Sequence, residues 1–155
     1  MKWFALRCHS LSVLILGAWC AAPLLADDWP QYMRGPEHAG DAAGEALRLP
    51  LGLATCVQLE DAVTTAPAIV AGKVYVVDQM GTAYCIDPKA NRILWKTSPE
   101  GEQARGCNTS SPCVVRGRMF YGTTAGRLHI LDAASGKVLR SIDVGWPITG
   151  SPTAA

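Results

Sequence analysis

Residues 64–97, TTAPAIVAGKVYVVDQMGTAYCIDPKANRILWKT, and residues 109–142, TSSPCVVRGRMFYGTTAGRLHILDAASGKVLRSI, are two copies of one segment. They align without a gap at a constant offset of 45 residues, and a third copy begins at Thr149-Gly-Ser-Pro152. A period of about 40–45 residues that holds four short strands is typical of a propeller blade. The sequence therefore predicts an all-β fold, a β-propeller fragment with about two complete blades of four antiparallel strands.

Turn residues divide each copy into its strands. The predicted strands are residues 66–70, 73–78, 82–87 and 92–98 in the first copy, and 111–115, 118–123, 127–132 and 137–142 in the second. Tight hairpins need a backbone with positive φ, which glycine adopts without steric cost and asparagine tolerates. The repeated turn positions are Gly72, Gly81 and Asn91 in the first copy, and Gly117, Gly126 and Gly136 in the second.

An aspartate ends the third strand of each copy, Asp87 in the first and Asp132 in the second. Each precedes a turn, where a carboxylate accepts hydrogen bonds from nearby backbone N–H groups. The two residues belong to different blades, near the outer edge. We therefore expect both to be structural and not catalytic.

The first 26 residues have the layout of a secretory signal peptide. Lys2 and Arg7 precede an apolar stretch at residues 11–25, and the small residue Ala26 stands before Asp27. The alternative is a retained membrane anchor, for which the apolar stretch is short. We expect cleavage after Ala26 and an exported protein, periplasmic or extracellular, with no membrane span in the mature chain.

The predicted organisation follows from these boundaries. It comprises a signal peptide at 1–26, an N-terminal segment at 27–60, blade 1 at 64–98, blade 2 at 109–142 and the start of blade 3 at 149–155. Within the N-terminal segment, residues 54–60 are predicted to form a lone strand. Such a strand completes the last blade in many propellers, and this chain contains no partner for it.

The charge balance bears on the possible partners. The chain has 14 Lys and Arg against 13 Asp and Glu, a net charge of +1, and loss of Lys2 and Arg7 with the signal peptide changes this to −1. A nearly neutral chain without a basic run has no electrostatic footprint for nucleic acid. We expect protein partners or the remaining blades of the same propeller.

The cysteines of the mature chain permit disulfides, since their number is even and the protein is expected to be exported. They are Cys56, Cys85, Cys107 and Cys113. Cys107 and Cys113 flank the loop before blade 2 and are the candidate bridge. Cys85 replaces an aliphatic residue of the other copy and is expected to be a buried thiol. The chain has no CxxC pair, and only His38 and His129 could join a zinc site, so none is expected.

The stretch Tyr84-Cys-Ile-Asp-Pro-Lys-Ala-Asn-Arg-Ile-Leu-Trp95 resembles the pyrroloquinoline-quinone (PQQ) repeat, Y-A-L-D-x-x-T-G-K-x-L-W. In that family the Trp docks onto the neighbouring blade near the turn Gly. The second copy keeps the turn but has Arg140 at the Trp position. The resemblance implies that Trp95→Ala costs roughly 3–5 kcal/mol in an intact ring. Residues 28–40, DWPQYMRGPEHAG, also resemble the N-terminus of secreted PQQ-like propellers.

The resemblance implies two function classes. Quinoprotein dehydrogenases hold PQQ and calcium near the axis of an eight-bladed propeller and use an Asp as base. The propeller component of outer-membrane β-barrel assembly binds partner proteins and no cofactor. The chain has no adjacent cysteine pair and no acidic set that we could assign to calcium or to a base. We therefore assign no catalytic, cofactor-binding or metal-ligating residue.

The favoured function is a non-catalytic scaffold or binding module of the cell envelope. The alternative is the N-terminal part of a PQQ-dependent alcohol or sugar dehydrogenase whose catalytic residues lie beyond Ala155. Two blades leave unpaired faces and edges, which invite aggregation. We therefore expect residues 27–155 alone to form aggregates or a poorly packed monomer.

Overall fold

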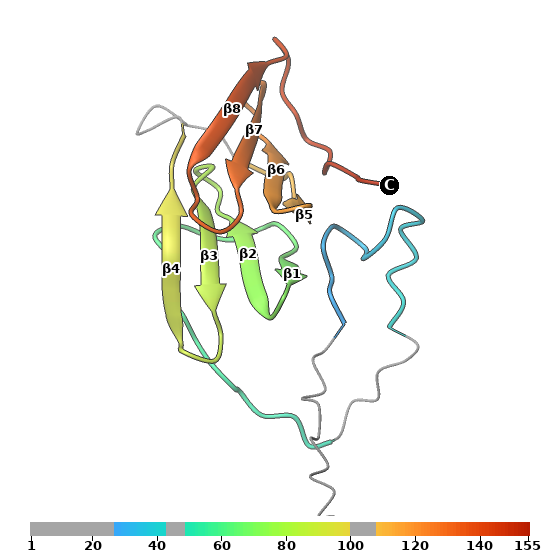
Figure 1. Ribbon diagram of the computed structural model, residues 1–155, viewed down its shortest axis with the longest axis vertical. Helices are drawn as coiled ribbons and strands as arrows, with labels where there is room; N and C mark the ends of the chain where they lie inside the picture. Colours follow the sequence, from blue (N-terminus) through green and yellow to red (C-terminus); the bar gives the residue numbers. More distant parts are fainter. Residues whose placement is uncertain (1–26, 43–48, 100–107) are drawn as a thin grey trace, which may run out of the picture.

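The computed structural model describes residues 27–42, 49–99 and 108–155, and these residues form β-strands and no helix (Figure 1). The first sheet has the order β1 (Ala68–Val70), β2 (Lys73–Val77), β3 (Ala83–Asp87) and β4 (Arg92–Thr97). The second has the order β5 (Cys113–Val115), β6 (Arg118–Gly122), β7 (Arg127–Asp132) and β8 (Val138–Asp143). All neighbouring strands pair antiparallel. The all-β prediction with four-stranded blades is confirmed.

The first hairpin of each sheet shows how the sequence sets the turns. Ala71 and Gly72 connect β1 to β2 with φ values of 50° and 69°, and Arg116 and Gly117 connect β5 to β6 with 48° and 72°. Positive φ at both central residues is the type I′ geometry, whose twist matches that of the flanking strands. The other repeated turn positions, Gly81, Asn91, Gly126 and Gly136, also have positive φ.

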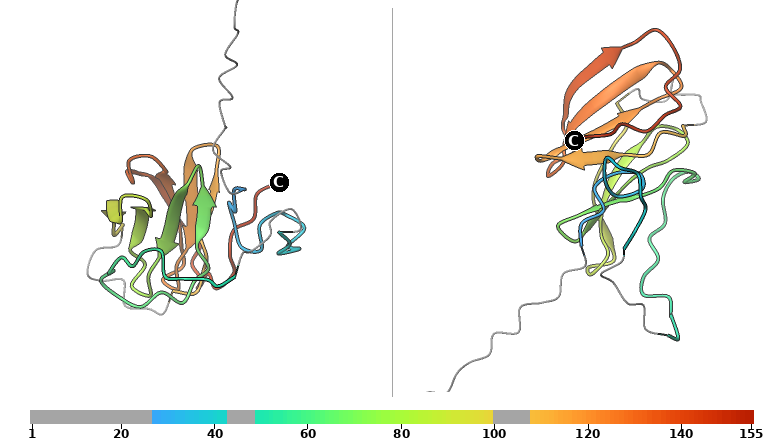
Figure 2. Two further views of the ribbon diagram at one scale, coloured as in Figure 1. Left: turned by 90° about the horizontal axis from the view of Figure 1, so that it is seen from below. Right: turned by 90° about the vertical axis from the view of Figure 1, so that its right-hand side faces the viewer.

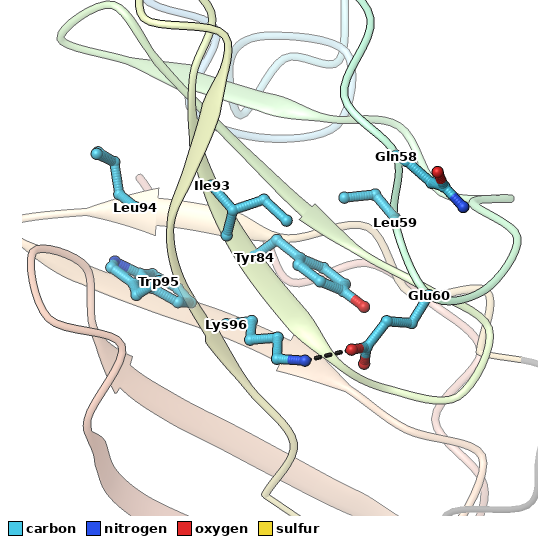
Figure 3. Close-up of a pocket in the computed structure, with 8 residues that line it drawn as sticks. All are labelled: Gln58, Leu59, Glu60, Tyr84, Ile93, Leu94, Trp95 and Lys96. Carbon is cyan, nitrogen blue, oxygen red and sulfur yellow. Dashed lines mark hydrogen bonds and ion pairs between the residues drawn. The ribbon is translucent and has the colours of Figure 1, made fainter.

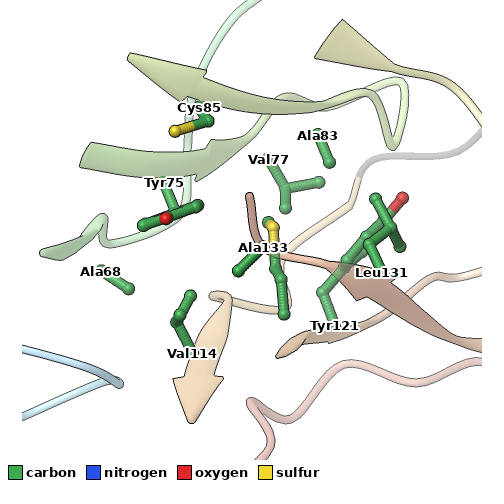
Figure 4. Close-up of a cluster of buried hydrophobic side chains, with 10 residues drawn as sticks. Ala68, Tyr75, Val77, Ala83, Cys85, Val114, Tyr121, Leu131 and Ala133 are labelled. Carbon is green, nitrogen blue, oxygen red and sulfur yellow. The ribbon is translucent and has the colours of Figure 1, made fainter. Parts of the chain in front are cut away.

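The main core lies between the two sheets (Figure 4). Side chains alternate between the two faces of a strand, so Tyr75 and Val77 of β2 face the second sheet. The buried residues of this core are Ala68, Tyr75, Val77, Ala83 and Cys85 from the first sheet and Val114, Met119, Tyr121, Leu131 and Ala133 from the second. Cys85 is the buried thiol that the repeat predicts. The two blades are thus packed face to face.

The opposite face of the first sheet is covered by an irregular segment. Val57 and Leu59 pack against the buried Val76, Tyr84 and Ile86. Side-chain exposure alternates along residues 54–60, as in a strand, but the structure assigns no strand there. A strand requires a hydrogen-bonded neighbour, and the described residues provide none for this segment, so the lone strand stays a prediction.

The sheets meet at their first strands, β1 and β5, which mark the axial side of the two blades. The start of the third copy, residues 149–155, continues along this side without strand pairing. Residues 27–42, drawn in blue, lie beside this C-terminal segment in Figure 1 and in both views of Figure 2. Trp29 forms a two-way bridge with Ile69 of β1, with both N···O distances at 2.7 Å.

Candidate functional site

Hydroxyl groups join successive repeats at one end of the axial strands. The Ala66 backbone N–H donates to Ser111 Oγ at 3.0 Å, and the Ser111 N–H donates to Ser151 Oγ at 2.9 Å. These three residues occupy the same position in the three copies. One hydrogen bond is therefore repeated from copy to copy around the axial side, and we call this the hydroxyl end.

A second set of contacts supports the same end. Thr64 Oγ1 donates to the Asn108 carbonyl at 3.1 Å, and Thr109 Oγ1 donates to the Thr149 carbonyl at 3.3 Å. Thr64 and Thr109 are also equivalent in the repeat. Among the described residues, every buried side-chain nitrogen and oxygen has a hydrogen-bond partner. The polar side chains here hold repeats together.

A buried carboxylate organises the turn between β2 and β3. Asp78 is 1% exposed and accepts hydrogen bonds from the Met80 and Thr82 backbone N–H groups at 3.0 and 2.9 Å and from the Tyr84 hydroxyl at 2.8 Å. Burial, followed by the hydrogen bond to Asp78, raises the pKa of Tyr84 to about 12. The Asp78 carboxylate thus ties the turn to the Tyr84 side chain. Sequence reasoning missed Asp78, because the second copy has Thr123 at this position.

The second blade replaces the aspartate–tyrosine pair with other groups. His129, at the position of Tyr84, is 1% exposed, and its Nδ1 lies 2.8 Å from Ser141 Oγ. Its ring centroid lies 5.2 Å from that of Tyr121. The histidine is therefore packed inside the blade. In the parts of the chain that the structure describes, no three His, Cys, Asp or Glu side chains gather as a metal site would require.

The two strand-ending aspartates lie in turns of separate blades. Asp87 accepts hydrogen bonds from Lys73 Nζ at 2.6 Å and from the backbone N–H groups of Lys89 and Ala90 at 3.0 and 3.1 Å. These contacts, that of Lys73 first, lower the pKa of Asp87. Asp132 accepts from Ser135 through its hydroxyl at 2.6 Å and its backbone N–H at 2.8 Å, and its pKa is also lowered.

Trp95 of β4 joins the outer parts of the two blades. Its Nε1 donates to the Ala133 carbonyl at 3.0 Å, and Thr97 Oγ1 donates to the Gly136 carbonyl at 2.7 Å. A Cβ atom at Gly136 would lie 2.5 Å from the Trp95 ring. The structure thus brings together two of the repeat positions, Trp95 and Gly136, across the joint.

An open groove of about 710 Å³ lies on the far face of the first blade (Figure 3). Leu59 and Ile93 form its apolar wall, and an ion pair between Lys96 and Glu60 crosses it. Tyr84 lines its floor, with the hydroxyl bound to Asp78. The groove follows the seam between residues 58–60 and β4. Of its polar lining groups, Lys96 and Glu60 bind each other and the Tyr84 hydroxyl binds Asp78.

Two predictions concern residues outside the described ranges. Cys113 is buried and its Sγ lies 3.4 Å from Gln31 Oε1, whereas Cys107 lies outside the described residues, so the bridge between the two cysteines stays a prediction. The signal peptide at 1–26 lies outside them as well. Within the described residues, no helix has the length and apolar character needed to cross a membrane.

Two dehydrogenases are similar to this chain in sequence. Quinohemoprotein alcohol dehydrogenase ADH-IIG of Pseudomonas putida is 28% identical over 116 residues, and 1-butanol dehydrogenase (cytochrome c) of Thauera butanivorans is 31% identical over 116 residues. Each alignment covers 66% of this chain, but only 16% and 17% of the respective relative. The chain thus spans about a sixth of the length of these curated relatives.

Solved structures show the same fold. The quinohemoprotein alcohol dehydrogenase from Comamonas testosteroni superposes with a TM-score of 0.71 at 24% identity, over 83% of this chain and 22% of that one. BamB from Moraxella catarrhalis gives 0.54 at 24% identity, over 64% and 30%. The family described as outer membrane protein assembly factor BamB matches residues 56–153. Since that match covers more than half of the chain, the chain belongs to this family of PQQ-like repeat β-propellers.

Proposed function

We propose that this chain is part of a non-catalytic β-propeller of the cell envelope, which serves as a scaffold and binds protein partners. The observation that carries this proposal is the repeated joint at the hydroxyl end. Ala66 and Ser111 each donate a backbone N–H to the serine hydroxyl of the next copy, at 3.0 and 2.9 Å. Polar groups on the axial side are thereby used to fix one repeat against the next.

Exposed apolar side chains at the end of the second blade support a protein partner. Trp146 is 80% exposed, Leu139 49% and Val144 46%. Exposed aromatic and aliphatic side chains are the groups that another protein or another blade covers at an interface. The partner that fits this surface is a protein element with an apolar face.

The second candidate function is that of a PQQ-dependent alcohol dehydrogenase to which this chain contributes the N-terminal blades. The observation in its favour is the similarity to quinohemoprotein and butanol dehydrogenases over most of the chain. In this case the quinone and calcium would be held by residues outside the described ranges. The described residues would then support the ring without contacting either group.

Dye reduction by the intact exported protein separates the two functions. The protein is mixed with PQQ and calcium, given primary alcohols and sugars, and followed by reduction of an artificial electron acceptor. The scaffold predicts no reduction above that of samples without PQQ. Saturable reduction that requires both PQQ and calcium would overturn the proposal and support the dehydrogenase.

A further inference from the structure

Residues 29–31, near the start of the described chain, contact three successive repeats. In each repeat the contact is made by the backbone N–H of the same position. The backbone N–H of Ile69 donates to the Trp29 carbonyl at 2.7 Å, and that of Val114 donates to the Pro30 carbonyl at 2.7 Å. The Ala154 N–H donates to Gln31 Oε1 at 2.8 Å. Ile69, Val114 and Ala154 each stand two residues after the proline that opens their copy. Trp29, Pro30 and Gln31 therefore each accept a hydrogen bond from one of three consecutive repeats.

This arrangement places the segment close to the propeller axis. One residue of extended chain advances by at most about 3.6 Å. Three neighbouring residues can reach three successive blades only where the innermost strands converge. β1 and β5 are the strands at which the two sheets meet, which agrees with this position.

Further contacts anchor the segment on both sides of the three acceptors. Asp28 Oδ1 accepts a hydrogen bond from the Ala71 backbone N–H at 2.8 Å. His38 Nε2 lies 2.9 Å from Thr153 Oγ1 in the third copy. Gln31 is 2% exposed, and its amide oxygen also accepts from the Cys113 thiol. The contact between Gln31 and the second and third repeats is thus buried.

We propose that residues 28–41 form an axial clasp, which pairs with the inner edge of each successive repeat and closes one end of the central channel. The clasp binds at Ile69, Ala71 and Val114, whereas the hydroxyl end begins at residues 64–66 of the same axial strand. On each axial strand the clasp contact, at Ile69 or Val114, therefore stands three residues after the hydroxyl-end position, Ala66 or Ser111.

Hydrogen–deuterium exchange in the intact protein tests the repeat-by-repeat pairing. In the native protein the amides of Ile69, Val114 and Ala154 are all protected. Of these three amides, only that of Ala154 loses its acceptor in Gln31→Leu, so its exchange rises about fivefold to tenfold while the Ile69 amide keeps its rate. Gln58→Leu, at an exposed glutamine outside the clasp, leaves all three unchanged. Equal exchange at Ala154 in Gln31→Leu and native protein would overturn the proposal.

Thiol alkylation after reduction provides a second measurement. Asp28→Ala removes an exposed anchor without leaving a cavity, and it is compared with Asp61→Ala, whose carboxylate accepts the Ala62 N–H outside the clasp at 2.7 Å. Opening of the clasp raises the alkylation rate of Cys113 severalfold, while Cys85 in the inter-blade core stays at its native rate. An unchanged rate at Cys113, or an equal rise at both thiols, contradicts an independent clasp. Neither measurement involves a cofactor or a partner, so its outcome is separate from that of the proposed function.

Discussion

Gly136→Ala tests whether the joint between the blades depends on Trp95. Gly136 has a φ of 72°, and an added Cβ would lie 2.5 Å from Cδ2 and Cε3 of the Trp95 ring. These atoms belong to a rigid ring, so the ring as a whole must move. Gly117 also has a φ of 72°, but nothing lies within 4 Å of a Cβ built there. Gly117→Ala is therefore a matched control for the backbone cost alone.

The two variants differ by a magnitude that the structure sets. A non-glycine residue in the left-handed region costs roughly 1–2 kcal/mol, which is the whole cost expected for Gly117→Ala. Burial of a full Trp side chain contributes about 3–5 kcal/mol, and Trp95 is half-buried, so its displacement costs about 2 kcal/mol. Gly136→Ala should therefore destabilise by about 3–4 kcal/mol. Trp95→Ala removes the same half-buried contact and also the hydrogen bond from Nε1 to the Ala133 carbonyl, so it should cost about 3 kcal/mol, the lower end of the sequence-based range.

Urea unfolding of the intact protein, followed by far-ultraviolet circular dichroism, measures these differences in the free energy of unfolding. A double-mutant cycle with Trp95→Ala supplies the decisive comparison. Without the ring, the cost of Gly136→Ala should fall by about 2 kcal/mol, which is the coupling free energy. Any excess over Gly117→Ala that is left comes from Thr97 Oγ1, which would lie 2.9 Å from the added Cβ. If Gly136→Ala and Gly117→Ala agree within about 0.5 kcal/mol in the native background, Trp95 does not support the joint and the reasoning is refuted.

Three further predictions concern titration and assembly. Burial is the main cause that raises the pKa of Tyr75 and of Tyr84 from 10.0 to about 12, so the unfolded state loses these protons first. Stability to urea should then fall as the pH rises from 10 to 12, and Tyr84→Phe should reduce that slope; an unchanged slope contradicts it. Lys73→Met should raise the pKa of Asp87, measured by NMR, and leave that of Asp132 in place, because only Asp87 has Lys73 as a partner. Residues 27–155 alone should sediment as aggregates or lack a sharp thermal transition, and a cooperative transition from a dispersed monomer would count against this.

The repeat was sufficient to predict the blades because their turns are encoded locally. Gly72 and Gly117 supply positive φ in equivalent hairpins, and the strands between the turns alternate as a two-sided core requires. The strand expected at 54–60 shows the limit of this reasoning. Its alternating pattern turns Val57 and Leu59 toward the first blade, but alternation cannot supply the hydrogen-bonded neighbour that a strand needs.

The clasp could not be predicted from the repeat, because its partners are backbone groups. An N–H two residues after each proline has no side-chain signature, so nothing in the three copies marks Ile69, Val114 and Ala154 as a set. The acceptors also differ in kind, since Trp29 uses a carbonyl and Gln31 a side-chain amide. Repeated blades can therefore be joined by a segment, residues 28–41, that is not itself part of the repeat. It follows that the repeat encodes each blade, whereas the non-repeated residues 28–41 hold the three copies together. Substitutions in residues 28–41 should therefore loosen the clasp without unfolding a blade.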